Sequence, residues 1–204
     1  PLIESGISVQ YITAVTSSFS DAVTGRIADL AIRELGPAPV PFSFICMGSE
    51  GRKEETLYTD QDNAIIYENI APAMEKETSV YFQKLGKRIC SDLNETGYSF
   101  CKGNIMAMNP KWCQPLQTWE NYFTEWIQTP EPKNLLDATI FFDLRHVYGD
   151  ETLTLRTREA ISRLAANNPT FIYHMAYNAC NTKLPQIVAG NDKTSETLDL
   201  KHAV

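Results

Sequence analysis

Apolar positions in the first part of the chain follow a helical period and then a strand pattern. From Ile7 to Leu35 they recur at spacings of three and four, which predicts one amphipathic helix. The apolar stripe of this helix consists of Ile12, Val15, Phe19, Val23, Ile27 and Leu30. Gly36 and the prolines that follow it are typical of a helix end. The short apolar run from Phe42 to Met47 predicts a buried strand.

The following segments alternate between strand and helix patterns. A second strand is predicted from Asp60 to Tyr67, and a helix from Ala71 to Glu95. The apolar stripe of that helix consists of Phe82, Leu85, Ile89 and Leu93. A third strand is predicted from Ile105 to Met108, where Asn109-Pro110 stops it. The order strand, loop, strand, helix, strand indicates an α/β unit.

From Trp112 onward the pattern predicts helices only. They are expected over Trp119 to Gln128, Lys133 to Tyr148, Glu151 to Ala165 with Asp150 as its cap, and Pro169 to about Lys183 after Asn168. The aromatic residues Trp119, Tyr122, Phe123 and Trp126 are expected to be core or domain interface and not a base-stacking platform. Residues 129–132 read TPEP and form the best linker candidate. We therefore predict an α+β fold: a small mixed-sheet domain with an N-terminal helix over 1–128, and an all-helical domain over 129–204.

Charge and composition narrow the classes of function. The net charge of −7 argues against a surface dedicated to nucleic acid or to an anionic membrane. No apolar run reaches the ~18 residues that would span a bilayer. The five cysteines show no metal-binding spacing, which favours free thiols in a reducing cytoplasm. Because the first residue is Pro1, the chain is expected to be a segment of a longer protein.

Two carboxylates stand at the start of the second predicted strand. Asp60 and Asp62 are two residues apart, so in an extended chain they point to the same side. Carboxylates held this close repel each other unless one is protonated or a cation lies between them. Mg²⁺ accepts one or two protein carboxylates together with phosphate oxygens and waters. The pair is therefore a candidate site for Mg²⁺ or Mn²⁺.

The turn after the first predicted strand supplies phosphate-binding chemistry. Gly48 allows the backbone to approach a ligand, and Ser49 offers a hydroxyl and an N–H. Gly51 frees the turn further, and Arg52 and Lys53 add positive charge. Such a loop beside a carboxylate pair is typical of phosphoryl or nucleotidyl transfer. Two ordinary turns remain the alternative, and a Walker-type loop is excluded because GxxxxGK[ST] does not occur.

These residues resemble the signature of the polymerase-β-like nucleotidyltransferase superfamily. Residues 48–67, GSEGRKEETLYTDQDNAIIY, are similar to a bacterial branch that is usually attached to CBS or cyclic-nucleotide-binding domains. That branch is related to the uridylyltransferase of the PII signalling protein and to the adenylyltransferase of glutamine synthetase. Residues 103–112 resemble its next strand, and residues 141–153 resemble the start of its helical substrate-binding domain.

The resemblance implies a reaction and a set of roles. Gly48 and Ser49 match the nucleotide-phosphate loop, with Gly51 and Arg52 in the same string, and Asp60 and Asp62 match the metal-binding carboxylates. Arg145, in residues 141–153, matches a helical arginine of the relatives. The implied reaction transfers UMP or AMP from an NTP to a hydroxyl acceptor, such as a PII-like protein, in the cytoplasm. Upstream sensor domains are implied as partners; membrane and nucleic acid are not expected.

One part of the superfamily pattern is missing. Active members carry a third carboxylate on a later strand, but residues 103–109 read GNIMAMN and contain no acid. Asn104 is the candidate at that place, and an amide can bind a metal but cannot accept a proton at neutral pH. Three functions therefore stay open: an active nucleotidyltransferase, a catalytically weak nucleotide-binding regulatory module, and an unrelated helical scaffold.

Overall fold

The computed structural model describes residues 8–55, 59–129 and 131–181 of the chain. The predicted end of the last helix, at Lys183, lies outside these residues. The helices are α1 Val9–Leu35, α2 Gly48–Gly51, α3 Glu75–Glu95, α4 Leu116–Gln128, α5 Pro132–Phe141, α6 Glu151–Ala166 and α7 Pro169–Asn181. The strands are β1 Phe42–Cys46, β2 Asn63–Tyr67, β3 Cys113–Pro115 and β4 Arg145–Gly149, and two short 3₁₀ turns are η1 Pro72–Met74 and η2 Pro110–Trp112.

The four strands form one mixed sheet in the order β3-β2-β1-β4. β1 pairs antiparallel with both β2 and β4, and β3 pairs parallel with β2. The predicted α+β fold with a small mixed sheet is therefore confirmed. In the β1–β2 register, Cys46 at the end of β1 stands opposite Asn63 at the start of β2. The turn after β1 therefore lies at the same end of the sheet as the acidic segment before β2.

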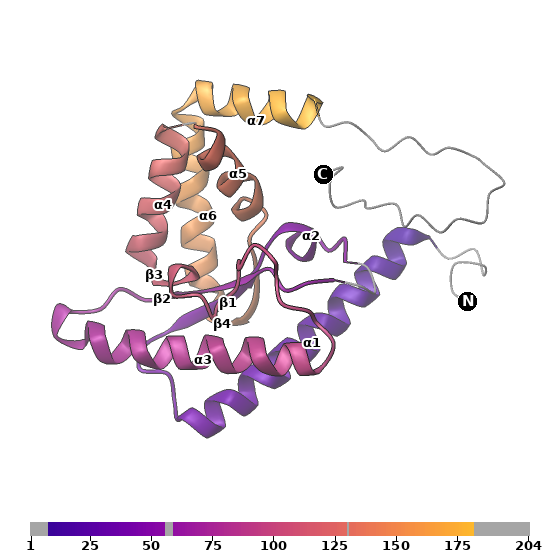
Figure 1. Cartoon of the computed structure of the whole chain (residues 1–204). Coiled ribbons are helices and arrows are strands. Elements are labelled where there is room, and N and C mark those ends of the chain that lie inside the picture. Colours follow the sequence, from indigo (N-terminus) through magenta and orange to yellow (C-terminus); the bar gives the residue numbers. More distant parts are fainter. Residues whose placement is uncertain (1–7, 56–58, 130, 182–204) are drawn as a thin grey trace.

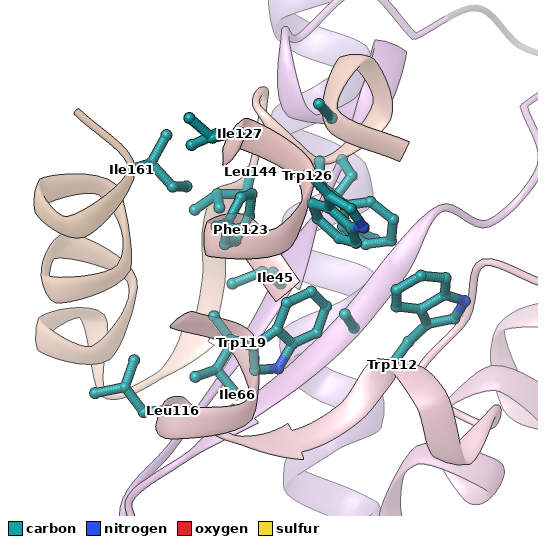
Figure 2. Close-up of a cluster of buried hydrophobic side chains, with 14 of the residues drawn as sticks. Ile45, Ile66, Trp112, Leu116, Trp119, Phe123, Trp126, Ile127, Leu144 and Ile161 are labelled. Carbon is teal, nitrogen blue, oxygen red and sulfur yellow. The ribbon is translucent and has the colours of Figure 1, made fainter. Parts of the chain in front are cut away.

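Helices cover both faces of this sheet (Figure 1). Phe44 and Ile65 belong to a hydrophobic cluster with α1 and α3. Ile45 and Ile66, their neighbours along the strands, belong to a second cluster with α4, α5 and α6, as Figure 2 shows. Because successive side chains of a strand point to opposite faces, both central strands are buried along their whole length. The aromatic residues of α4 lie in the second cluster, which confirms that they are core.

The N-terminal helix is confirmed, but its apolar stripe is buried only in part. Ile27 lies in the core, whereas Phe19 is 66% exposed. In the N-terminal half of α1 the buried face is formed by small polar residues, including Ser17 and Ser20. Both hydroxyls lie beside Glu55, in the loop that follows α2. This half of the helix therefore packs on a polar loop and not on an apolar surface.

The predicted third strand at Ile105–Met108 is wrong, and the strand beside β2 is Cys113–Pro115. The backbone near Ala107 has other partners: its N–H donates to Asn63 Oδ1 at 2.8 Å. Its carbonyl lies so close to Gly86 of α3 that a Cβ there would stand 2.3 Å from the oxygen. Because residues 105–108 bond to the Asn63 side chain and pack against α3, they do not form the regular hydrogen bonds of a β-strand.

The prediction of helices only after Trp112 is also wrong, because β3 and β4 lie in that part of the chain. The helix predicted to run to Tyr148 ends at Phe141, and the chain returns to the sheet as β4. A 2.8 Å hydrogen bond between Ser43 Oγ and His146 Nδ1 adds a side-chain link to the β1–β4 pairing. The boundary at residue 128 stays a prediction.

Several smaller predictions are confirmed. Asp150 accepts from the N–H of Thr152 at 2.9 Å and caps α6, and Asn168 accepts from the N–H of Phe171 at 3.2 Å at the start of α7. The five cysteines are free thiols. In the part of the chain that the structure describes, no helix combines the length and the apolar character that a membrane crossing requires.

Candidate functional site

The turn after β1 is folded directly against the acidic segment. The N–H of Met47 donates to the carbonyl of Asp62 at 2.9 Å, and α2 begins at the next residue. Gly48 has a φ of +58°, in the left-handed region that favours glycine. A Cβ on Gly48 would lie 3.4 Å from Asp62 Oδ2. The predicted Gly-Ser turn and the predicted carboxylate are thus brought into contact.

Two buried amides hold the acidic segment in place. Gln61 is 2% exposed, and its Nε2 donates to the carbonyl of Cys90 at 3.0 Å and to that of Tyr98 at 2.8 Å. Asn63 is equally buried and accepts from the backbone N–H of Ala107, as described above. Both amides therefore face the protein interior. The two acids alternate with these amides along the chain, so we infer that they face the opposite way.

The predicted strand start at Asp60 is three residues too early. β2 begins at Asn63, and Asp60 forms only an isolated parallel bridge with Ser99. The N–H of Gln61 donates to the carbonyl of Ser99 at 2.9 Å, which keeps the backbone tied to its neighbour. The acidic residues thus stand on a short bridged segment just before the strand.

Asp62 has a thiol as a neighbour. The thiol of Cys101 donates a hydrogen bond to the Asp62 carboxylate. Burial is the main reason that the pKa of Cys101 rises to about 11, and the negative charge of Asp62 raises it further. The thiol therefore stays protonated at neutral pH and acts as a donor to the carboxylate.

Two glutamates behind the turn were not predicted as part of the site. Glu50 lies in α2, and its carboxylate accepts from the backbone N–H of Asp62. Burial, and after it the negative charges of Glu55 and Asp62, raise the pKa of Glu50 well above its ordinary range. Burial likewise raises the pKa of Glu55, which is 1% exposed. No described residue makes a hydrogen bond to either Glu55 oxygen within 3.5 Å, although two serine hydroxyls stand beside it.

Arg145 lies on β4, so its predicted place on a helix is wrong. Its guanidinium holds Asp21 of α1 through two hydrogen bonds, Nη1 to Oδ2 at 2.7 Å and Nη2 to Oδ1 at 2.9 Å. Nη2 also donates to the backbone carbonyl of Glu50 at 3.1 Å. Arg145 thus contacts the turn, but its charge is matched by an aspartate.

Arg52 is likewise paired with carboxylates. Its Nε donates to Glu54 at 2.8 Å and its Nη1 to Asp143 at 2.6 Å. Gly51 packs against the same segment: a Cβ there would stand 2.0 Å from the carbonyl oxygen of Asp143. Gly51 therefore has a packing reason to be glycine, independent of any ligand.

The remaining predicted residues are Ser49 and Asn104. Ser49 is half-buried in α2, and its carbonyl accepts from the N–H of Glu54 at 2.9 Å. Asn104 is exposed in a turn with a φ of +56°, so it does not stand on a strand beside β2. The strand that does stand there, β3, reads Cys-Gln-Pro. It offers no third carboxylate either.

The donor set suits a hard cation that is shared with a ligand. Within residues 8–55, 59–129 and 131–181, no group of three or more His, Cys, Asp or Glu side chains is arranged to hold a metal ion. Asp60 and Asp62 supply two carboxylates, which is the number that Mg²⁺ takes when substrate phosphates complete its shell. The residues present thus fit a metal that binds together with a nucleotide.

A separate hollow of about 390 Å³ lies at the opposite end of β1. It is lined by residues 38–42, Gly149 and Asp150, and Asp150 is its sole ionisable residue. A hollow without a basic group has little to offer a phosphate. The contact between Gly48 and Asp62 is therefore the better candidate site.

A small mixed sheet with a Gly-Ser turn packed on an acidic segment is the arrangement that the sequence led us to expect of a nucleotidyltransferase. The family model described as Putative nucleotidyltransferase DUF294 matches residues 1–133. This match spans more than half of the 204 residues, so the chain belongs to that family. A search of curated proteins gives no match.

Proposed function

We propose that this chain transfers a nucleoside monophosphate from an NTP to a hydroxyl acceptor with the help of Mg²⁺ or Mn²⁺. The observation that carries the proposal is the position of the Asp62 carboxylate beside Gly48: a Cβ on Gly48 would lie 3.4 Å from Asp62 Oδ2. It brings the turn that would hold phosphates against an acid that would hold their metal. Membership of a nucleotidyltransferase family supports the same reaction.

The proposed roles follow from the chemistry of each group. Asp60 and Asp62 hold the cation, which would shield the charge of the triphosphate and lower the barrier to its cleavage. The Gly48–Ser49 backbone approaches the phosphates. Arg52 is held by Glu54 and Asp143, so it can bind a phosphate only if these two ion pairs open. The phosphate and the two carboxylates would compete for one guanidinium. We therefore assign Arg52 to the ion pairs with Glu54 and Asp143 in the chain without nucleotide.

Transfer of UMP or AMP to a PII-like protein, with sensor domains upstream and in the cytoplasm, is the finer form of this proposal. It rests on the resemblance of residues 48–67 to the uridylyl- and adenylyltransferases. The proposed acceptor would be presented by the helices after residue 128.

A nucleotide-binding regulatory module is the second candidate function. It is favoured by the composition of β3, whose three residues Cys113, Gln114 and Pro115 include no acid. Glu50 lies near Asp62, but it is buried and its carboxylate already accepts from the Asp62 backbone N–H. Without a base for the acceptor hydroxyl, nucleotide would bind with little turnover.

A transfer assay separates the two functions. The protein is incubated with each NTP, labelled at the α-phosphate, with Mg²⁺ or Mn²⁺ and a PII-like protein. An enzyme transfers label to protein and releases pyrophosphate, and Asp60→Asn and Asp62→Asn abolish both. Tight binding without label transfer or pyrophosphate release supports the regulatory module and refutes turnover by this chain with that acceptor.

A further inference from the structure

The guanidinium of Arg145 links helix α1 to the turn after β1. Arg145 stands on β4, holds Asp21 of α1 with two hydrogen bonds and donates a third to the carbonyl of Glu50 in α2. Three elements that are far apart in the sequence therefore meet at one side chain. Figure 1 shows α1 crossing this end of the sheet near α2.

The ion pair between Arg145 and Asp21 lies where solvent screens it poorly. The Arg145 side chain is 17% exposed and that of Asp21 is 29% exposed. A bidentate pair between arginine and a carboxylate is both stronger and more directional than a single bond. The Nε of Arg145 is buried without a hydrogen-bonding partner among the described residues, so the hydrogen bonds that orient the guanidinium are those to Asp21 and to the Glu50 carbonyl.

We propose that Arg145 is a positioning residue for the Gly48–Gly51 turn and that Asp21 of α1 sets its orientation. This inference rests on the proposed function only for its effect on nucleotide binding, because the three hydrogen bonds exist without a ligand. If Asp21 moves or loses its charge, the guanidinium is free to rotate and the Glu50 carbonyl loses its donor. The position of α1 thereby becomes a determinant of the turn that would bind phosphate.

The chain offers a matched control on the same helix. Asp29 of α1 also bonds to β4, accepting from the hydroxyl of Tyr148 at 2.7 Å. This second link joins the same two elements but makes no contact with the turn. Asp21→Asn and Asp29→Asn therefore remove the same charge from the same helix, and only the first should affect α2.

Hydrogen exchange of the turn measures the proposed effect without any nucleotide. The N–H groups of Gly51, Arg52 and Glu54 are hydrogen-bonded within the turn at 2.9–3.0 Å. Loss of a charge-assisted bond should speed their exchange about tenfold in Asp21→Asn, with no change in Asp29→Asn. Arg145→Lys provides a second test, since one ammonium cannot hold both Asp21 oxygens and the Glu50 carbonyl. It should also speed exchange.

Nucleotide affinity provides the second readout. With Mg²⁺ present, Asp21→Asn and Arg145→Lys should weaken NTP binding by about tenfold while Asp29→Asn matches the wild type. Equal exchange and equal affinity in Asp21→Asn, Arg145→Lys and Asp29→Asn overturn the inference. Faster exchange in a protein that binds no NTP leaves the positioning role standing and defeats the proposed function instead. If one of the two test variants, Asp21→Asn or Arg145→Lys, does not fold, the other carries the test.

Discussion

The amide of Gln61 anchors the acidic segment through two hydrogen bonds. Gln61→Met keeps nearly the same side-chain volume but removes both donors, to the carbonyls of Cys90 and Tyr98. Because Gln61 is 2% exposed, water cannot replace these bonds. The substitution therefore isolates the hydrogen bonds from the packing.

Gln61→Met removes one hydrogen bond from each of two backbone carbonyls. A buried hydrogen bond that is lost without replacement costs about 1–3 kcal/mol. Of the two acceptors, that of Cys90 lies in a buried environment and that of Tyr98 in a partly buried one. We expect Gln61→Met to lower the free energy of unfolding by about 2–4 kcal/mol. Nucleotide binding should weaken as well, because the flanking aspartates lose their fixed backbone.

Chemical denaturation is the assay, with Gln114→Met as the control. Gln114 also donates from Nε2 to a backbone carbonyl, that of Pro110 at 2.8 Å, but this bond is exposed. Water can replace it, so the control should change the free energy of unfolding by less than about 0.5 kcal/mol. If Gln61→Met and Gln114→Met have the same free energy of unfolding, the amide does not anchor the segment and the reasoning is refuted.

Two further predictions concern the turn and the acids behind it. Gly51→Ala should lower the free energy of unfolding by about 1–3 kcal/mol, because its Cβ would stand 2.0 Å from the Asp143 carbonyl oxygen. The control is Gly103→Ala, whose Cβ would meet side chains no closer than 3.6 Å. Thermal unfolding should show no change for this control. The raised pKa of Glu55 means that the folded protein holds a proton that the unfolded chain releases above the ordinary value of 4.5. The free energy of unfolding should therefore fall as pH rises from 4.5 through the raised pKa, and Glu55→Gln should flatten that slope and stabilise the protein at pH 7; an unchanged slope in denaturation at a series of pH values would contradict this sign.

The fold was predictable where local pattern and tertiary packing agree. The long helices and the two central strands have strong periods, and both faces of β1 and β2 are buried as continuous apolar runs predict. β4 was missed because residues 141–148 also satisfy a helical spacing. What makes them a strand is pairing with β1, about a hundred residues earlier, and no local pattern reports that.

The candidate site was predictable only for the groups inside one motif. Gly48 and Asp62 are fourteen positions apart and do meet, as the signature implied. The partners of the two arginines, Asp21 and Asp143, come from other elements and carry no local signal. The alternation of Gln61 and Asn63 with the acids was visible in the sequence. Two amides that alternate with two acids indicate that the amides face the protein interior, and we could have used this signal.

The most direct test of the central claim is calorimetric titration of ATP, UTP, GTP and CTP, with and without Mg²⁺, into the wild type and Asp62→Ala. We predict that the wild type binds at least one nucleotide and that this binding requires Mg²⁺. Asp62→Ala should remain folded but should not bind. The free energy of unfolding of Asp62→Ala should be at least that of the wild type, because an acid is removed from beside Glu50. Binding of no nucleotide by folded wild-type protein, or equal binding by Asp62→Ala, would contradict the account.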